Sequence, residues 1–285
     1  MILWAHGPPP ARLDALSVLK AWPFDPLLWL AMAALAWVLL RSLRAVPSYP
    51  AARRRWLWGG YAVLMVALAS PLAAFADWVF WVHMVQHLLV TLVAAPMLLL
   101  GAPLALFTRA SSPRTRRRIA RVAHGRVAQA LTHPFVAWSS FTLAMWLTHF
   151  TGLYDAALAN QVLHGVEHVL YLAVALLFWW PVIGLDPGAR RLGWPARIGY
   201  LIVAIPQQSF LGLAIYSSKR VLYANYESLE RSWGPAALSD QRIAGMVMWI
   251  GGDFVLLACL IATLMAWMRA DEREAHRIDR RLGLS

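Results

Sequence analysis

The chain contains 285 residues, of which 60% are hydrophobic and only 14% are charged, and it carries 16 tryptophans. This composition excludes a soluble globular protein, because apolar runs long enough to cross a bilayer recur along the whole sequence. The net charge of +12 would suit nucleic-acid binding. However, the cations lie in short segments between the apolar runs, where they normally set membrane orientation, so we expect no nucleic-acid partner. A lone cysteine, Cys259, excludes an internal disulfide framework and a C-x-x-C metal site.

Seven apolar stretches, each close to the ~20 residues that a hydrocarbon core requires, follow one another along the chain. They predict an all-α bundle of seven transmembrane helices in a single integral membrane domain, residues 1–285. The expected spans are 26–43, 56–75, 78–102, 134–153, 161–185, 198–216 and 242–268. Aromatic residues near the span ends, Tyr154 among them, predict interfacial anchors, and Pro96, Pro181 and Pro206 predict kinks. The first 20 residues lack the pattern of a cleaved signal peptide, so we expect the first span to direct insertion.

The distribution of Lys and Arg predicts the orientation of the bundle. Of the 26 cations, 20 fall in the segments that follow the first, third, fifth and seventh spans. The segment after the third span is the most basic, with seven arginines between Arg109 and Arg126. Because Lys and Arg accumulate in cytoplasmic loops, we expect the N-terminus outside and the C-terminus inside the cell.

Five histidines lie within these spans, and this orientation places all of them near the outer face: His83, His87, His149, His164 and His168. At ~1.5 Å of rise per residue, the first two lie roughly 8 and 14 Å below Trp78. HMVQH and HGVEH are i, i+4 pairs, so each presents two imidazoles on one helical face. An imidazole inside a membrane is costly without a partner. Two such pairs and a fifth histidine at one depth therefore predict a metal or cofactor site.

The residues around these histidines favour copper. Imidazole alone suits zinc, copper, iron or nickel, but thioethers favour Cu(I), and Met84, Met145 and Met248 lie at positions from which a sulfur could join the site. Glu167 lies between the histidines of the second pair and is expected either to orient an imidazole or to bind the metal itself. Asp253, in the last span, must be paired, protonated or near water, and is a candidate residue of a proton or ion path.

Several stretches resemble one known family. They are HMVQHLLVTLVAAPMLLLGAP, LTHFTGLYDAAL followed by HGVEHVLYLAVALLFWWPVIG, and DQRIAGMVMW, and they are similar to the CtaG family of bacterial membrane-embedded cytochrome c oxidase assembly proteins. The resemblance extends from about Trp56 to Trp267. It implies a seven-span protein of the bacterial cytoplasmic membrane that supplies copper to a haem-copper oxidase. The residues that match the family's motifs are His83, Met84, His87, His149, His164, His168, Asp240, Gln241, Met248 and Trp249.

We therefore expect a non-enzymatic copper-binding assembly factor whose partners are cytochrome c oxidase subunits, the bilayer and an extracytoplasmic copper chaperone. A transporter or a copper reductase would have the same sequence features. A haem-binding membrane protein and a di-iron membrane oxygenase remain alternatives, because both use histidines from facing helices. The few arginines on the outer side count against haem propionates. A retinal protein is excluded because the two lysines, Lys20 and Lys219, lie outside the last span.

Overall fold

The computed structural model describes residues 14–23, 25–188, 191–230 and 232–282. The predicted signal-free N-terminal segment up to residue 13 lies outside these residues, as do Arg12, Arg190 and Arg231 of the cation count. Every regular element in the described part is helical, as the sequence predicts. In chain order the elements are α1 (Ala15–Lys20), α2 (Pro26–Ala45), α3 (Ala51–Leu68), α4 (Pro71–Trp78), α5 (Phe80–Leu88), η1 (Leu89–Ala94), α6 (Ala95–Leu100), α7 (Pro103–Ala110), α8 (Pro113–Ala123), α9 (Arg126–Leu131), α10 (Pro134–Phe150), α11 (Leu153–Ala159), α12 (Gln161–Ile183), α13 (Trp194–Ser217), α14 (Ala224–Glu227), α15 (Ala237–Met246), η2 (Val247–Gly251) and α16 (Gly252–Leu282).

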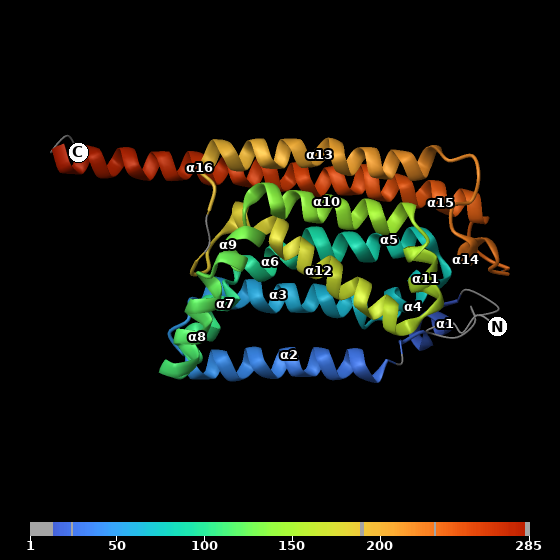
Figure 1. Cartoon of the computed structure of the whole chain (residues 1–285), viewed down its shortest axis with the longest axis horizontal. Helices are drawn as coiled ribbons and strands as arrows, with labels where there is room; N and C mark the ends of the chain where they lie inside the picture. The colour runs from blue at the N-terminus through green and yellow to red at the C-terminus, as the bar shows by residue number, and fades with distance from the viewer. Residues whose placement is uncertain (1–13, 24, 189–190, 231, 283–285) are drawn as a thin grey trace.

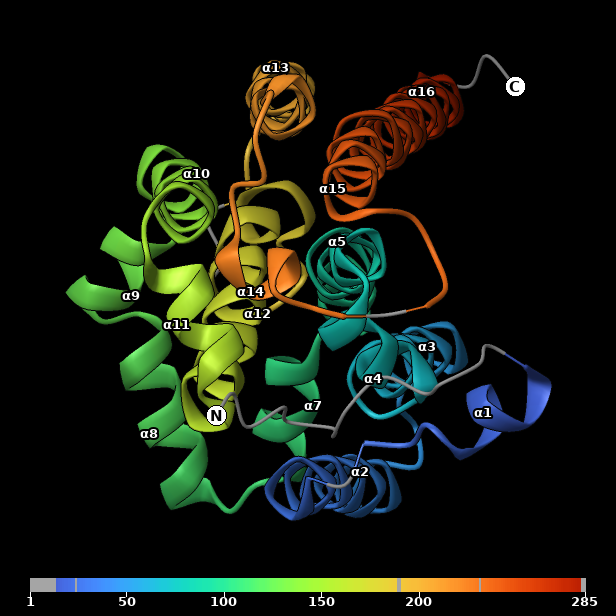
Figure 2. The same ribbon diagram turned by 90° about the vertical axis from the view of Figure 1, so that its right-hand side faces the viewer.

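The long helices run side by side along the length of the molecule (Figure 1). Viewed from one end, α5 and α12 lie at the centre, with α10, α13 and α16 on one side and α2 and α3 on the other (Figure 2). Five helices are long and apolar enough to cross a membrane, and a sixth span results if α3 and α4 are counted as one. The 17-residue α10 is not among them, although it packs along α12.

The predicted second span is not one continuous helix. The chain breaks between Leu68 and Pro71, and α4 is bent by 42° relative to α3. The cause is local: Pro71 cannot continue the hydrogen-bond ladder of α3, and Ser70 starts a new helix by accepting a hydrogen bond from the Leu72 amide at 3.2 Å. The short α4 is therefore positioned separately, and its chain leads directly into α5.

Among the described elements, two π-helical segments interrupt the helices, η1 between α5 and α6 and η2 between α15 and α16, and in both a side chain from a neighbouring helix binds a main-chain carbonyl of the segment. The Trp179 indole donates to the Thr91 carbonyl in η1 at 2.9 Å, and the Gln208 amide donates to the Met248 carbonyl in η2 at 3.2 Å. These bonds compensate for the altered ladder, which would otherwise leave buried carbonyls unpaired. Segment η1 begins at Leu89, two residues after His87, so the irregularity lies close to the histidine pair of α5.

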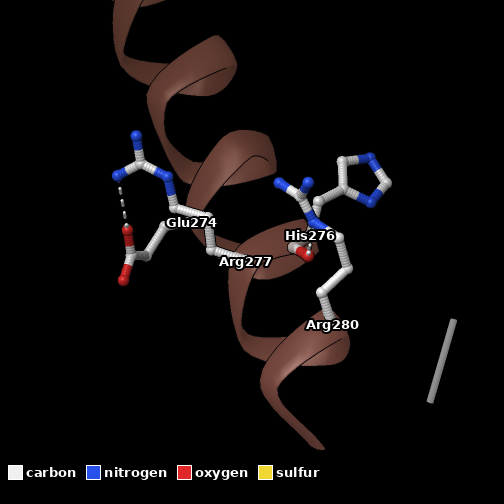
Figure 3. A network of polar contacts seen from close by, with 4 residues as sticks. All are labelled: Glu274, His276, Arg277 and Arg280. Carbon is white, nitrogen blue, oxygen red and sulfur yellow. Dashed lines mark hydrogen bonds and ion pairs between the residues drawn. The ribbon is translucent and has the colours of Figure 1, made fainter. Parts of the chain in front are cut away.

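The last helix is longer than predicted, because α16 continues to Leu282 and projects beyond the bundle (Figure 1). Its end is polar and exposed. Glu274 and Arg277 form an ion pair at 3.6 Å, and the Arg280 side chain donates to the His276 carbonyl at 3.2 Å (Figure 3). Exposed pairs of this kind contribute little to stability. This part of the helix is charged and exposed, so we do not count it as part of the membrane span.

Candidate metal centre

The five predicted histidines converge in the interior of the bundle from three different helices. His83 and His87 come from α5, His149 from the end of α10, and His164 and His168 from α12. Between helices, the ring centroids are 5.6 Å apart for His83 and His164, 6.0 Å for His87 and His149, and 6.3 Å for His87 and His168. All except His168 are buried, and His168 is partly buried. The sequence prediction that these residues share one site is consistent with this geometry.

The tightest part of the centre is formed by His83, His87 and Glu167. The Nε2 atoms of the two histidines are 2.7 Å apart, and one ligand atom from each of the three residues lies within 4.8 Å of the others. A metal ion bound at about 2.0–2.1 Å by two nitrogens in tetrahedral geometry would hold them roughly 3.3 Å apart. The pair would therefore have to open by only a few tenths of an ångström.

Hydrogen bonds to the other ring nitrogens favour the tautomer that binds metals. The Nδ1 atom of His149 donates to the Met145 carbonyl at 2.7 Å, which leaves its Nε2 as the atom with a free lone pair. The Tyr226 hydroxyl donates to the Ala76 carbonyl at 2.7 Å and therefore accepts from His83 Nδ1 at 3.3 Å. His83 Nε2 is then also unprotonated and faces into the centre.

The buried ring nitrogens without a hydrogen-bond partner among the described residues include His149 Nε2 and His87 Nδ1. Buried polar atoms are almost always paired, so each exception calls for an explanation. For His149, a bound ligand on Nε2 provides one. For His87, the Nε2 proton is donated to His83 Nε2. Its Nδ1 is therefore unprotonated, and no neighbouring group in the described part of the chain donates a hydrogen bond to it. The ring nitrogens thus fit a cation that takes the place of the hydrogen bond between His83 and His87, with the His87 proton on Nδ1.

Aromatic rings from α5, α11 and the α14 segment cover one side of the centre. Tyr154 is fully buried, with its ring 5.2 Å from that of His83 and 5.7 Å from that of His149. Its predicted role as an interfacial anchor is wrong, because α11 folds back between α10 and α12 and carries the ring inward. Tyr223 and Tyr226, from the segment around α14, contact Tyr154 and Phe80. Sequence analysis missed these two residues, because nothing in the pattern of a connecting loop distinguishes a covering tyrosine.

Asp240 and Gln241 position the elements of the centre without joining it. The Asp240 carboxylate accepts from the amides of Phe80 and Trp81 at 3.1 and 3.0 Å, and so caps the start of α5 from α15. Gln241 accepts from the Leu222 amide at 2.7 Å and fixes the segment that leads to Tyr223 and Tyr226. Both residues belong to the motif noted in the last span.

The predicted sulfur ligands Met84, Met145 and Met248 are all buried in the main apolar core. Their ligand role stays a prediction. Asp253 accepts from the Ser209 hydroxyl at 2.7 Å and lines a pocket on the surface of α13 and α16. No histidine lines this pocket, so its surroundings do not connect Asp253 with the imidazoles. A part in a proton path also stays a prediction.

The fold and the centre define a helical multi-pass membrane protein with a buried cluster of histidines. Residues 33–270 match the family model described as cytochrome c oxidase caa3 assembly factor (Caa3_CtaG), and the chain belongs to this family. The resemblance inferred from the sequence motifs is thereby confirmed.

The chain is also similar to curated proteins whose names give no function. Uncharacterized proteins of Mycobacterium bovis and Mycobacterium tuberculosis are each 31% identical over 276 residues. An uncharacterized protein of Mycobacterium leprae is 30% identical over 250 residues. The alignments cover 92%, 92% and 85% of this chain but only 42%, 42% and 38% of the relatives, so the chain spans less than half of their length. No solved structure matches the chain.

Proposed function

We propose that the protein holds copper ions at the histidine centre and passes them to a haem-copper cytochrome c oxidase during assembly of that enzyme. One observation carries this proposal: five histidines from α5, α10 and α12 converge inside an apolar bundle, with two ring nitrogens 2.7 Å apart. Burying so many imidazoles in a membrane protein without a ligand would be costly. The chain belongs to a family of cytochrome c oxidase assembly factors, and we therefore take the oxidase as the recipient of the copper.

Among the metal ions that an oxidase needs, copper is the one that the histidine and methionine side chains suit best. Imidazole nitrogens bind both copper oxidation states, and the nearby methionines would favour Cu(I) if a sulfur joins the set. His83, His87, His149 and Glu167 are the residues we expect to hold the ion, with His164 and His168 completing the cluster. We propose a carrier role without catalysis. The aromatic cover of Tyr154, Tyr223 and Tyr226 would exclude water and lipid from the bound ion.

The topology required for this role has seven spans, with the centre at the extracytoplasmic side of the bacterial cytoplasmic membrane. Helix α10 would be the seventh span, since it runs alongside its neighbours and its 17 residues are close to the length needed to cross a bilayer (Figure 1). The N-terminus would lie outside and the C-terminus inside, as the cation count predicts. Copper would then come from an extracytoplasmic chaperone and leave towards oxidase subunits on the same side.

A non-haem iron site is a second candidate, because His83, His87 and Glu167 form a set of two imidazoles and one carboxylate. Non-haem iron oxygenases use this set of ligand types. Haem is disfavoured at the same place. Two imidazoles one turn apart on one helix, with nitrogens 2.7 Å apart, leave no room for a porphyrin between them.

Metal analysis of the purified protein separates these candidates. We expect copper to co-purify with the wild-type chain and to be lost in His83→Ala and His87→Ala, because each change removes a ligand from the tightest pair. The matched controls are His124→Ala and His276→Ala, whose side chains are exposed and remote from the cluster. Iron in place of copper would favour the second candidate. Unchanged copper in both α5 variants would refute the assignment of the site.

A further inference from the structure

A pocket lined by charged and apolar residues lies at the end of the bundle opposite to the histidines, where α3 begins, α7 runs and the chain leaves α12 (Figure 1). Its volume is about 440 Å³. The residues that line it are Arg53, Ala105, Thr108, Arg109, Leu185, Asp186 and Pro187. Because these elements are helix ends and connecting segments, the pocket lies at one end of the bundle, where we expect the membrane surface to be. Nothing in the oxidase-assembly proposal uses it.

The carboxylate of Asp186 is buried in this pocket with only one oxygen paired. The residue is 7% exposed, and its Oδ1 accepts from the Ala105 amide in the first turn of α7 at 2.7 Å. The other oxygen, Oδ2, is buried without a hydrogen-bond partner among the described residues. Burial raises the pKa of Asp186 to about 6, so the group is still mainly ionised at neutral pH. An unpaired buried carboxylate oxygen is an acceptor that lacks its donor.

Two arginines share the pocket, and a tyrosine positions them. Tyr49 is buried, and its hydroxyl lies 2.7 Å from the Gly101 carbonyl and 2.8 Å from the Ala102 carbonyl, so its ring is fixed. The Arg109 guanidinium lies 6.0 Å from the centre of this ring, and Arg53 interacts with the hydroxyl. Neither arginine forms an ion pair with Asp186 in the described structure. The pocket therefore combines two guanidinium groups and one carboxylate, with a net charge of +1.

We propose that this pocket binds the phosphodiester headgroup of a phospholipid of the phosphatidylglycerol type. Two guanidinium groups match the paired oxygens of a phosphate, and glycerol hydroxyls can donate to Asp186 Oδ2. The charges also balance, because a phosphatidylglycerol headgroup carries one negative charge. Choline offers Asp186 no donor. Ethanolamine offers a donor but brings a positive charge to a pocket that already has net charge +1.

Binding of short-chain lipids to the purified full-length protein in detergent tests this proposal by titration calorimetry. We expect dihexanoyl phosphatidylglycerol to bind at least about tenfold more tightly than dihexanoyl phosphatidylcholine, since only its headgroup carries a net negative charge and hydroxyl groups that can form charge-assisted hydrogen bonds with Asp186. Arg53→Gln and Arg109→Gln should each weaken it by about tenfold. Arg54→Gln and Arg117→Gln are the controls, because both side chains are exposed and neither lines the pocket. Equal binding of the two lipids, or equal loss in the control variants, would overturn the proposal in favour of a diffuse basic surface.

Two further ligands test the role of Asp186 and the choice between a lipid and free phosphate separately. Phosphatidylmethanol has the same charge as phosphatidylglycerol but no hydroxyl, so it should bind about tenfold more weakly to the wild type. Equal affinity would overturn the role of Asp186. Inorganic phosphate should not displace the lipid at millimolar concentration, because it lacks both the hydroxyls and the acyl chains. Displacement at that concentration would identify a site for free phosphate instead. Only variants that keep wild-type thermal unfolding are compared.

Discussion

The positions of single protons decide how the centre can bind a cation. His83 and His149 each use Nδ1 for a hydrogen bond outside the cluster, so their Nε2 atoms are the ones available to a ligand. His87 lies between them and lacks such a bond on Nδ1 in the described structure. We infer that His87 donates its Nε2 proton to His83 Nε2 when no cation is bound, and that this proton moves to His87 Nδ1 when a cation binds to Nε2.

The Tyr226 hydroxyl offers a test of this arrangement. Tyr226→Phe removes the group that holds His83 Nδ1 while leaving the aromatic cover in place. We expect a 10 to 100-fold weaker affinity for Cu(I), because partners that orient a ligating histidine have effects of about this size. Competition with a chromophoric Cu(I) chelator measures it. Tyr223→Phe is the control, since its hydroxyl binds only the His149 carbonyl at 3.2 Å. An equal loss in both variants would contradict a specific role of the bond between Tyr226 and His83.

Much of the centre could be predicted from the sequence, because i, i+4 spacing fixes which side chains share a helical face. The same rule could not place Tyr154, Tyr223 or Tyr226, whose positions depend on how α11 and the α14 segment fold back over the helix ends. It also gave no reason to expect Asp240 at the start of α5, since the contact joins residues about 160 positions apart. Long-range contacts of this kind have no local sequence pattern.

At the scale of elements, α13 makes a close backbone contact with α15 and η2. A Cβ atom at Gly212 would lie 2.6 Å from the Trp249 amide nitrogen, and one at Gly245 would lie 2.6 Å from the Tyr216 amide nitrogen. Small residues allow helices in membranes to approach in this way and to gain van der Waals contact. The two helices can pack closely only because both positions are glycine.

Gly212→Ala should therefore push α13 and α15 apart. We expect a loss of about 1–3 kcal/mol in unfolding free energy, because the added methyl group meets backbone atoms that cannot rotate aside. Gly199→Ala on the same helix is the matched control, since a methyl group added at Gly199 would meet nothing within 4 Å. Thermal unfolding in detergent measures both variants. Equal melting temperatures for the two would contradict the close contact.

A pH-dependent contribution to stability is expected where the chain leaves α12. Burial raises the pKa of Asp186 from 3.8 to about 6, against the opposing effect of Arg53. Because the folded state holds this proton more tightly than the unfolded state, the contribution of Asp186 to stability falls as pH rises from about 4 to about 6. The full change is at most about 3 kcal/mol.

Asp186→Asn removes this titration and keeps an oxygen for the Ala105 amide. Relative to the wild type, the variant should gain unfolding free energy between pH 4 and pH 7, measured by denaturant titration in detergent at several pH values. The other carboxylates titrate in both proteins, so their contributions to the pH dependence cancel in the difference between variant and wild type. A difference that stays constant with pH would contradict the shifted pKa.

The helices themselves could largely be predicted from the sequence, and their irregularities could not. Hydropathy over about 20 residues averages out a break such as the one before Pro71. It also does not detect η1 and η2, because a π-helical segment changes the hydrogen-bond register without changing the composition. The bonds from Trp179 and Gln208 that accompany these segments come from other helices.

At the scale of the whole molecule, the proposed orientation places the histidine end outside the cell and the arginine-rich end inside. Ala156 and Ala130 lie at opposite ends of the bundle and are both exposed. In a Cys259→Ser background, Ala156→Cys should react with an impermeant thiol reagent added to intact cells, and Ala130→Cys should react only after lysis. Labelling of Ala130→Cys alone in intact cells would reverse the orientation.

The central claim is that the protein provides copper to an oxidase, and a deletion strain tests it most directly. Haem and copper are measured in oxidase purified from cells that lack the protein, grown with and without added copper. We expect normal haem, little copper and low activity, with partial recovery of copper and activity when the medium is supplemented, because mass action can replace a high-affinity donor. Normal copper together with missing haem would contradict the account.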